Sequence, residues 1–280
     1  MRENEFKALI SLLEDDDPSV GSHVENTLLS MGNSVIPRLE AAWEIELNET
    51  VQGRIEDIIQ TIQLHQTEDE LKEWKSSPHT PLLQGWYLIT KYQFPEISFE
   101  TYYNSVNRLI HKAWLEHTPH MNIPEKISVI NRLLYQRERY KLNRSNPLDP
   151  NNYFLNGLVE SKKGGPISLG MLHMIVCREL KIPIQGIPIL GHFILVYRDK
   201  RNEFFLDPIN KGAFFTRKDL EKYLKEMKIP SKNMYFEPVS NVEVIQGLVE
   251  MLLNCYRNKK KKNEASILQW ENLLNLLKYE

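Results

Sequence analysis

Residues 164–207 decide the fold that the sequence predicts. The first part reads GGPISLGMLHMIVCREL (164–180), an apolar run introduced by a Gly-Gly-Pro turn. Proline suits the first position of a helix, so we expect a buried helix from residue 166. The second part reads IQGIPILGHFILVYRDKRNEFFLD (184–207), and its pattern is typical of strands at 184–190, 192–198 and 203–206. One buried helix followed by antiparallel strands predicts an α+β core.

Three polar side chains in this stretch could act together. Ser168 lies in the first turn of the expected helix, His192 begins a strand, and Asp207 ends the next one. This order can bring a nucleophile, a base and an orienting carboxylate together, and the positive end of the helix would favour an anionic nucleophile. A serine in a first helical turn is also a common local cap. Spacing alone favours the cap and leaves the triad open.

A run of short motifs extends from residue 146 to residue 212. They are Asn146-Pro147, Asp149-Pro150, Asn156, Gly165-Pro166-Ile167-Ser168-Leu169, Gly191-His192-Phe193, and Asp207-Pro208 with Gly212. This run strongly resembles the SirB-type branch of the transglutaminase-like superfamily, a domain that is also found fused to F-box modules in eukaryotes. The resemblance implies a papain-like core, in which a helix packs on a small antiparallel sheet.

The resemblance also implies where catalytic residues would lie. In active members of the superfamily, a cysteine at the start of the core helix pairs with a histidine and an aspartate on adjacent strands. His192 and Asp207 match the latter two, but Pro166 or Ser168 stands where the cysteine is expected. The SirB-type branch has no established activity to transfer to this chain.

The missing cysteine leaves three interpretations of function. The favoured one is a module that binds a protein or peptide partner without turnover. Its pocket is expected to be lined by Asn152, Asn156, Pro166 and Gly191. The alternative is a hydrolase or acyl transferase, such as an amidase or peptidase, with Ser168 as nucleophile, His192 as base and Asp207 as orienting group. The third is a structural or regulatory role in which His192 is a hydrogen-bonded strand histidine.

The first 65 residues are predicted to form four short amphipathic helices. The apolar stripes of the second and fourth superpose with an offset of 31 residues, so that Val20 matches Val51 and Leu28 matches Ile59. Helix pairs repeated at this spacing resemble a HEAT repeat, in which each pair buries its apolar face against a neighbour. Four ordinary helices in a coincidental register are the alternative. Thr67–Glu70 is predicted to start another helix, because its spacing is that of a capping box.

Further helices are expected on both sides of the core. The pattern predicts them at 82–92, at 99–115, from Pro124 onward, and as a closing pair at 251–256 and 265–277. The predicted parts of the chain are a HEAT-like region at 1–80, a transglutaminase-like domain at 81–240, and a helical pair at 241–280 that packs on the core. The basic residues Arg137, Arg139, Lys141 and Arg144 are expected to form a solvated surface.

Composition argues against several classes of function. With 35 basic and 37 acidic residues the net charge is -2, so no strong field attracts nucleic acid or an anionic membrane. No apolar run reaches the about 18 residues of a membrane span, the N-terminus does not resemble a secretory signal, and no metal, nucleotide or cofactor motif occurs. Cys177 and Cys255 are expected to be reduced thiols in a cytoplasmic protein, and Lys259–Lys262 a solvated turn.

Overall fold

The computed structural model describes residues 2–15, 17–189, 191–230, 235–258 and 264–278. The chain divides into two compact units, which are Met1–Glu73 with Lys91–Glu96, and Trp74–Thr90 with Ile97–Glu280. The turn predicted at Lys259–Lys262 lies outside the described residues.

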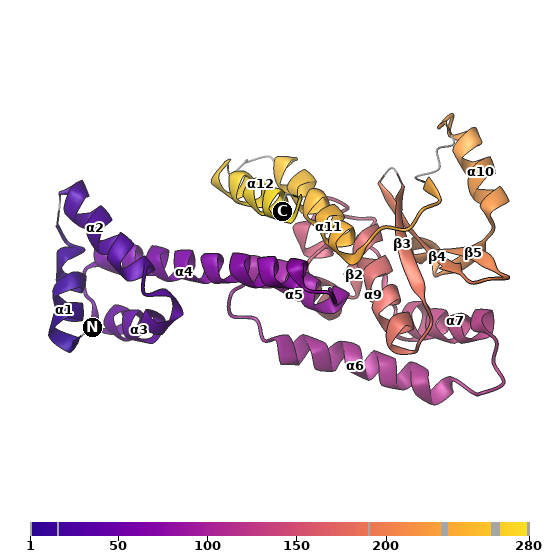
Figure 1. The fold of residues 1–280 in the computed structure, drawn as a ribbon, viewed down its shortest axis with the longest axis horizontal. Coiled ribbons are helices and arrows are strands. Elements are labelled where there is room, and N and C mark those ends of the chain that lie inside the picture. Colours follow the sequence, from indigo (N-terminus) through magenta and orange to yellow (C-terminus); the bar gives the residue numbers. More distant parts are fainter. Residues whose placement is uncertain (1, 16, 190, 231–234, 259–263, 279–280) are drawn as a thin grey trace. The chain divides into compact units, whose positions relative to one another are not determined.

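The first unit is helical. It contains α1 (Glu3–Leu12), α2 (Pro18–Leu29), the 3-10 helix η1 (Gly32–Val35), α3 (Ile36–Ile45) and most of α4 (Glu49–Ser76) (Figure 1). Residues of the two predicted stripes, such as Leu28 of α2 and Ile55 of α4, are buried in one apolar cluster. Isolated helices of this length are marginal in water, so this shared cluster is what stabilises them.

The predicted helix start at Thr67–Glu70 is wrong, because α4 runs through it. Thr67 is buried, and its hydroxyl donates a hydrogen bond of 2.9 Å to the carbonyl of Gln63, one turn earlier. This bond satisfies the hydroxyl inside the helix, so the threonine does not need a cap position. Glu70 forms an ion pair with Lys91 at 2.8 Å instead of capping a helix. The predicted fourth short helix is therefore the beginning of a helix of 28 residues.

The second unit is built around α9 (Pro166–Glu179), whose side chains from Ile167 to Cys177 are all buried. The other helical elements are most of α5 (Leu82–Gln93), α6 (Phe99–Glu116), α7 (Ile123–Asn131), the π-helix η2 (Arg132–Arg137), the 3-10 helices η3 (Pro150–Asn152) and η4 (Pro208–Asn210), α8 (Leu155–Ser161), α10 (Arg217–Glu226), α11 (Asn241–Arg257) and α12 (Glu264–Lys278). The helices predicted around the core are thus present, although α11 begins at Asn241, ten residues before the predicted start at 251.

The main sheet has four antiparallel strands in the order β3 (Ile184–Ile189), β4 (His192–Arg198), β5 (Glu203–Asp207) and β6 (Ala213–Phe215). The three predicted strands are confirmed. The sequence did not predict β6, nor the parallel pair of β1 (Lys141–Leu142) and β2 (Lys163–Gly164). Strands of two or three residues are too short to show an alternating pattern. A mainly helical chain with small sheets is consistent with the predicted α+β class.

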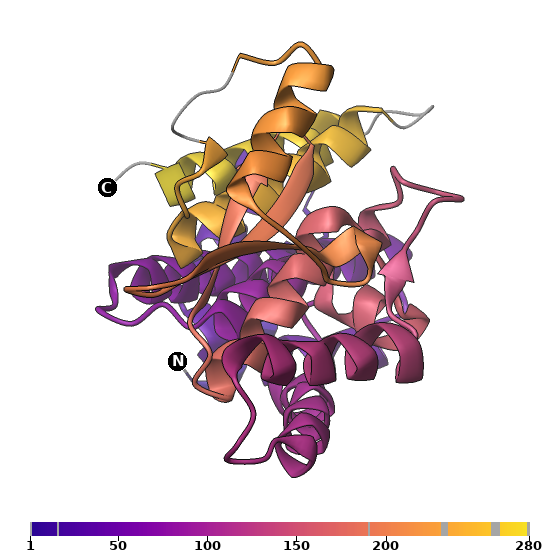
Figure 2. The ribbon, with the colours of Figure 1, turned by 90° about the vertical axis from the view of Figure 1, so that its right-hand side faces the viewer.

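The two faces of the main sheet pack against different helices. Phe193 lies on the face toward α9, where its ring leaves no room for a side chain at Gly170 of α9 or at Gly186 of β3. Ile194, the next residue of β4, is buried on the other face in a cluster with apolar residues of α10. Because successive strand residues point to opposite faces, His192 shares the α10 face with Ile194. Figure 2 shows the ribbon turned by 90° from the view of Figure 1.

The closing helical pair packs on the core. α11 contacts α9 and β3, and α12 packs along α11, where Arg257 and Glu271 form an ion pair at 2.6 Å. Cys255 of α11 and Cys177 of α9 are both buried, and their reduced state stays a prediction. Within the described ranges, no helix is both long and apolar enough to cross a membrane.

Candidate functional site

A cavity of about 340 Å³, here called the His192 cavity, lies between the main sheet and α10. It is lined by Ile189, His192, Ile194, Asp207, Asn210, Ala213, Phe214, Phe215, Asp219, Leu220 and Tyr223. The walls are mainly apolar and aromatic, with a few polar groups that converge on the same space. Sites for small molecules or for single side chains of a partner have this composition.

His192 reaches the cavity because of the turn that precedes it. Gly191 adopts a φ of 82°, a left-handed conformation that glycine tolerates best, and the chain then enters β4. The following Phe193 fixes the strand against α9, so the imidazole of His192 projects to the α10 side. There its ring meets the ring of Tyr223 edge to face, with the centroids 6.4 Å apart.

Asp207 ends β5 beside His192. Its carboxylate accepts a hydrogen bond of 3.1 Å from the amide of Ile209 and caps η4. Burial is the main influence on this group and raises the pKa of Asp207, while backbone hydrogen bonds and the nearby His192 act in the opposite direction. A partly desolvated carboxylate of this kind would be stabilised in its charged form by a cationic group of a ligand.

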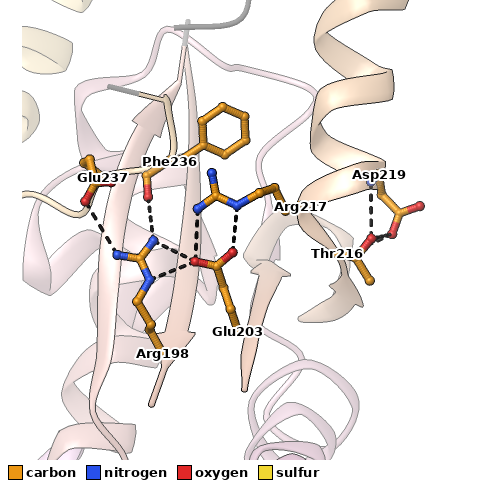
Figure 3. A network of polar contacts seen from close by, with 7 residues as sticks. All are labelled: Arg198, Glu203, Thr216, Arg217, Asp219, Phe236 and Glu237. Atoms are coloured by element: carbon orange, nitrogen blue, oxygen red, sulfur yellow. Dashed lines mark hydrogen bonds and ion pairs between the residues drawn. The ribbon is translucent and has the colours of Figure 1, made fainter. Parts of the chain in front are cut away.

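A network of charged side chains anchors α10 over the sheet and so shapes the cavity (Figure 3). Glu203 of β5 accepts hydrogen bonds from Arg217 of α10 at 2.8 and 3.1 Å, and from Arg198 of β4 at 2.8 Å. The hydrogen bond from Arg217 is the largest cause of a lowered pKa of Glu203. Asp219 caps α10 by accepting hydrogen bonds from the amide and hydroxyl of Thr216, at 2.8 and 2.6 Å.

Ser168 is part of a different, closed arrangement at the start of α9. Its hydroxyl is fully buried, donates a hydrogen bond of 2.6 Å to the carbonyl of Asn152, and accepts one of 2.9 Å from the amide of Gly165. A methyl group at Gly164 would come within 2.7 Å of the same oxygen. The hydroxyl therefore ties the helix start to the η3 loop, in space that the backbone already fills.

The structure brings two of the three predicted catalytic residues together. His192 and Asp207 line one cavity on the α10 face of the sheet. Ser168 lies on α9, which packs against the other face, and it does not line the His192 cavity as the described residues define it.

The four residues expected to line a pocket lie elsewhere. Asn152 is buried and fastens its loop, donating to the carbonyl of Asn146 at 2.8 Å. Asn156 is half-buried in α8, Pro166 is the first residue of α9, and Gly191 is exposed in its turn. Among the described residues that line the His192 cavity, none of these four occurs.

Sequence reasoning missed the aromatic walls of the cavity. Phe214 and Phe215 come from the unpredicted strand β6, and Tyr223 comes from α10. The pair Phe214-Phe215, separated from Gly212 only by Ala213, was the available signal, because a glycine turn followed by aromatic residues is typical of a short strand.

A second polar group that the sequence did not single out lies between η2 and α9. The Tyr135 hydroxyl and Nδ1 of His173 are 3.1 Å apart, and Nε2 of His173 has no hydrogen-bond partner among the described residues. Burial lowers the pKa of His173 to about 3, so its ring is neutral at neutral pH. Burial also raises the pKa of the Cys177 thiol, which therefore stays protonated and unreactive.

The described residues contain no group of histidine, cysteine, aspartate and glutamate side chains that could hold a metal ion.

Comparison with known proteins gives the relationships of the chain. The profile of the transglutaminase-like superfamily matches residues 100–250. A UPF0162 protein of Xylella fastidiosa is 28% identical over 66% of this chain and 68% of its own length, and one of Vibrio cholerae is 26% identical over 64% and 68%. F-box only protein 21 of Mus musculus is 26% identical over 46% of this chain and 21% of its own length. No solved structure gives a significant match.

Proposed function

The chain belongs to the transglutaminase-like superfamily, and from that premise we propose that it binds a protein or peptide partner without turnover. One observation carries the proposal. The His192 cavity contains His192 and Asp207, but the described residues that line it include no serine, threonine or cysteine. A histidine–aspartate pair beside an apolar wall, with no serine, threonine or cysteine for the histidine to activate, is suited to recognising a ligand and not to forming an acyl-enzyme intermediate.

The cavity walls indicate what the partner would present. Phe214 and Tyr223 are 42% and 40% exposed, so an apolar side chain could cover surface that is now in contact with water. Burial raises the pKa of Asp207, and a cation placed beside it would favour its charged form. We therefore expect a peptide in which an apolar residue lies next to a lysine or arginine.

The alternative is a hydrolase or acyl transferase that uses Ser168, His192 and Asp207. The meeting of His192 and Asp207 in one cavity supports it. The position of Ser168 counts against it, because a nucleophile must reach both its base and the substrate. The Ser168 hydroxyl is buried and bonded on the α9 side of the sheet.

The finer family and domain assignments belong to the same proposal. The motif run at 146–212 supports the SirB-type branch and a papain-like core for residues 81–240. The burial of both apolar stripes in one cluster supports a HEAT-like pair within residues 1–80. A helical pair at 241–280 completes this division. A cytoplasmic location, and the absence of nucleic-acid and membrane partners, stay predictions from composition.

The binding function is tested by selecting peptides from a phage-displayed random library. Fluorescence anisotropy titrations with the labelled selected peptides then measure their affinity. We expect apolar-basic motifs to be enriched, and Tyr223→Ala to weaken their binding by about tenfold, the equivalent of about 1.4 kcal/mol. Tyr103→Ala is a matched control, since Tyr103 is similarly exposed, at 45%, but belongs to α6. Selected peptides that bind Tyr223→Ala as tightly as the wild type would contradict the assignment of this cavity.

A serine-directed fluorophosphonate probe separates binding from catalysis. We expect no labelling of the folded protein, because the Ser168 hydroxyl is buried. Covalent modification of Ser168, identified by mass spectrometry and lost in His192→Ala, would overturn the proposal in favour of the hydrolase.

A further inference from the structure

A second cavity, of about 580 Å³, lies beside the β1–β2 pair. Five cationic side chains contribute to its wall: Arg139, Lys141, Arg144, Lys163 and Lys211. No acidic residue lines it in the described part of the chain. We call it the basic cavity. The cavity wall is therefore strongly positive, whereas the whole chain has a net charge of -2.

Two acidic residues near this region, Glu138 and Glu116, are paired with other cations. Glu138 forms an ion pair with Lys112 at 2.6 Å, and Glu116 pairs with Arg132 at 2.9 Å and with Arg137. The five cations of the basic cavity form no ion pair with any residue that the structure describes. All four residues of the basic stretch predicted to be a solvated surface are exposed, as predicted. Arg137 is ion-paired, and the other three also line the basic cavity.

The backbone holds these charges close together. Lys141 and Lys163 are direct partners in the parallel β1–β2 pair, and neighbouring strands lie only about 4.8 Å apart, so their charges repel. Arg139 and Lys211 adopt left-handed backbone conformations, with φ of 62° and 56°. Lys162, Lys181 and Lys228 adopt the same conformation without lining this cavity. The repulsion between Lys141 and Lys163 is therefore the feature that a bound anion would relieve.

The size and walls of the cavity select a class of ligand. Its volume falls within the range of small-molecule sites. The half-buried Leu142 supplies apolar surface beside the cations, whereas Tyr135 and Tyr140 in the wall are buried. Guanidinium groups bind phosphate through two parallel hydrogen bonds, whereas lysines act as point charges. A phosphate monoester carries roughly -1.5 to -2 charges at neutral pH, so two or three such groups would balance the five cations.

We propose that the basic cavity binds a small molecule that carries two or three phosphate groups. The phosphates occupy the space between the Lys141–Lys163 pair and the two arginines, and the remainder of the molecule lies against Leu142. Binding neutralises the repulsion within the β1–β2 pair.

Tripolyphosphate is a suitable probe, and calorimetric titration of the full chain measures its affinity. We expect saturable binding at one site that weakens as salt is added. The double variant Lys141→Gln/Lys163→Gln should lose affinity by at least about tenfold. The matched control Lys200→Gln/Arg201→Gln removes two exposed charges from the β4–β5 turn and should bind like the wild type.

Three results would overturn the proposal. They are the absence of saturable tripolyphosphate binding to the wild type, an equal loss of affinity in the control variant, and binding of a short single-stranded RNA through the same lysines when tripolyphosphate does not bind. Urea unfolding without ligand checks that each variant is folded. If the double variant is not, Lys163→Gln alone takes its place, since Lys163 is exposed.

Discussion

Two cavities of opposite chemistry share one short segment of the chain. Asp207 and Asn210 line the His192 cavity, whereas Pro208, Ile209 and Lys211 line the basic cavity. The first is walled by aromatic rings and carboxylates, and the second by five cations. A 3-10 helix has about three residues per turn, so neighbouring side chains of η4 point in different directions and serve two walls.

The contrast shows what net charge does and does not exclude. Acidic and basic residues almost cancel over the chain, which removes a long-range field toward nucleic acid or membranes. The fold leaves the five cations of the basic cavity without acidic partners among the described residues, because Glu116 and Glu138 form ion pairs with other basic residues. A balanced composition is therefore compatible with a strongly cationic site of small-molecule size.

The strongest way to break the comparison is to loosen the packing between the main sheet and α9, because η4, which serves both cavities, contacts both. Phe193 is buried against Gly170 and Gly186, and its removal would leave a void in the core. We expect Phe193→Ala to lower the free energy of unfolding by about 3–5 kcal/mol, measured by urea denaturation. Because η4 contacts both α9 and β4, ligand binding should weaken in both cavities.

Phe204→Ala is the matched control for this change. Phe204 lies in β5 but is only half-buried, so the same truncation should have a clearly smaller effect on the free energy of unfolding. Equal losses of unfolding free energy in the two variants would mean that the packing of Phe193 against Gly170 and Gly186 does not stabilise the fold as its contacts indicate.

The second prediction separates the start of α9 from the His192 cavity. Ser168→Ala removes the hydroxyl that joins Asn152 to Gly165, so we expect unfolding to become easier by about 1–2 kcal/mol. Peptide affinity in the His192 cavity should not change. Ser128→Ala removes a comparable helix hydrogen bond, of 2.8 Å to Pro124, at an exposed position, and should shift stability by no more than about 0.5 kcal/mol. Loss of peptide binding in a stable Ser168→Ala variant would place Ser168 in the site after all.

Ser168 and His192 also mark how far the sequence could predict the site. The helix α9 and the strands β3–β5 are long enough for their apolar periods to be recognised, and the alternation along β4 places His192 and Phe193 on opposite faces. The sequence does not show which face α9 covers. The face is fixed by the Phe193 ring, which packs against both Gly170 of α9 and Gly186 of β3. This contact exists only when the helix and the sheet are packed together.

The residues that form the walls of both cavities could not be predicted from the sequence for a related reason. The His192 cavity takes walls from β6 and α10, and the basic cavity combines residues 139–145 with Lys163 and Lys211. Each contributing segment is short or irregular, so none has a period to recognise. Their chemistry becomes visible only when chain segments distant in sequence meet.

The third prediction concerns pH and the histidine beneath the basic cavity. The pKa of His173 is about 3 in the folded protein, against an ordinary value of 6.5. Between these values the unfolded chain binds more protons than the folded protein. The contribution of His173 to the free energy of unfolding is therefore complete above pH 6.5 and is lost as the pH falls toward 3. We expect a loss of about 1 kcal/mol from about pH 6.5 to about pH 5.5, measured by urea unfolding.

Two histidine variants test whether His173 causes this change of the free energy of unfolding with pH. His173→Gln should flatten it, because the substituted side chain does not titrate, whereas His120→Gln, at an exposed position, should leave it in place. An unchanged slope in His173→Gln would mean that other groups cause the acid sensitivity. Tyr135 both contacts His173 and lines the basic cavity, so tripolyphosphate titrations of His173→Gln would show whether the buried pair supports that wall.

The smallest expected effect is a substitution that makes the protein more stable. Lys163→Gln removes the like-charge neighbour of Lys141 across the β1–β2 pair, so we expect the free energy of unfolding to rise by about 0.2–0.5 kcal/mol. Lys200→Gln, in the exposed β4–β5 turn, should change it less. In the presence of tripolyphosphate the order should reverse, because the wild type gains binding free energy that the variant lacks. A variant that is less stable than the wild type under both conditions would show that Lys163 serves the fold. The reversal would show instead that the repulsion is retained for a ligand, which the aromatic and acidic His192 cavity could not bind.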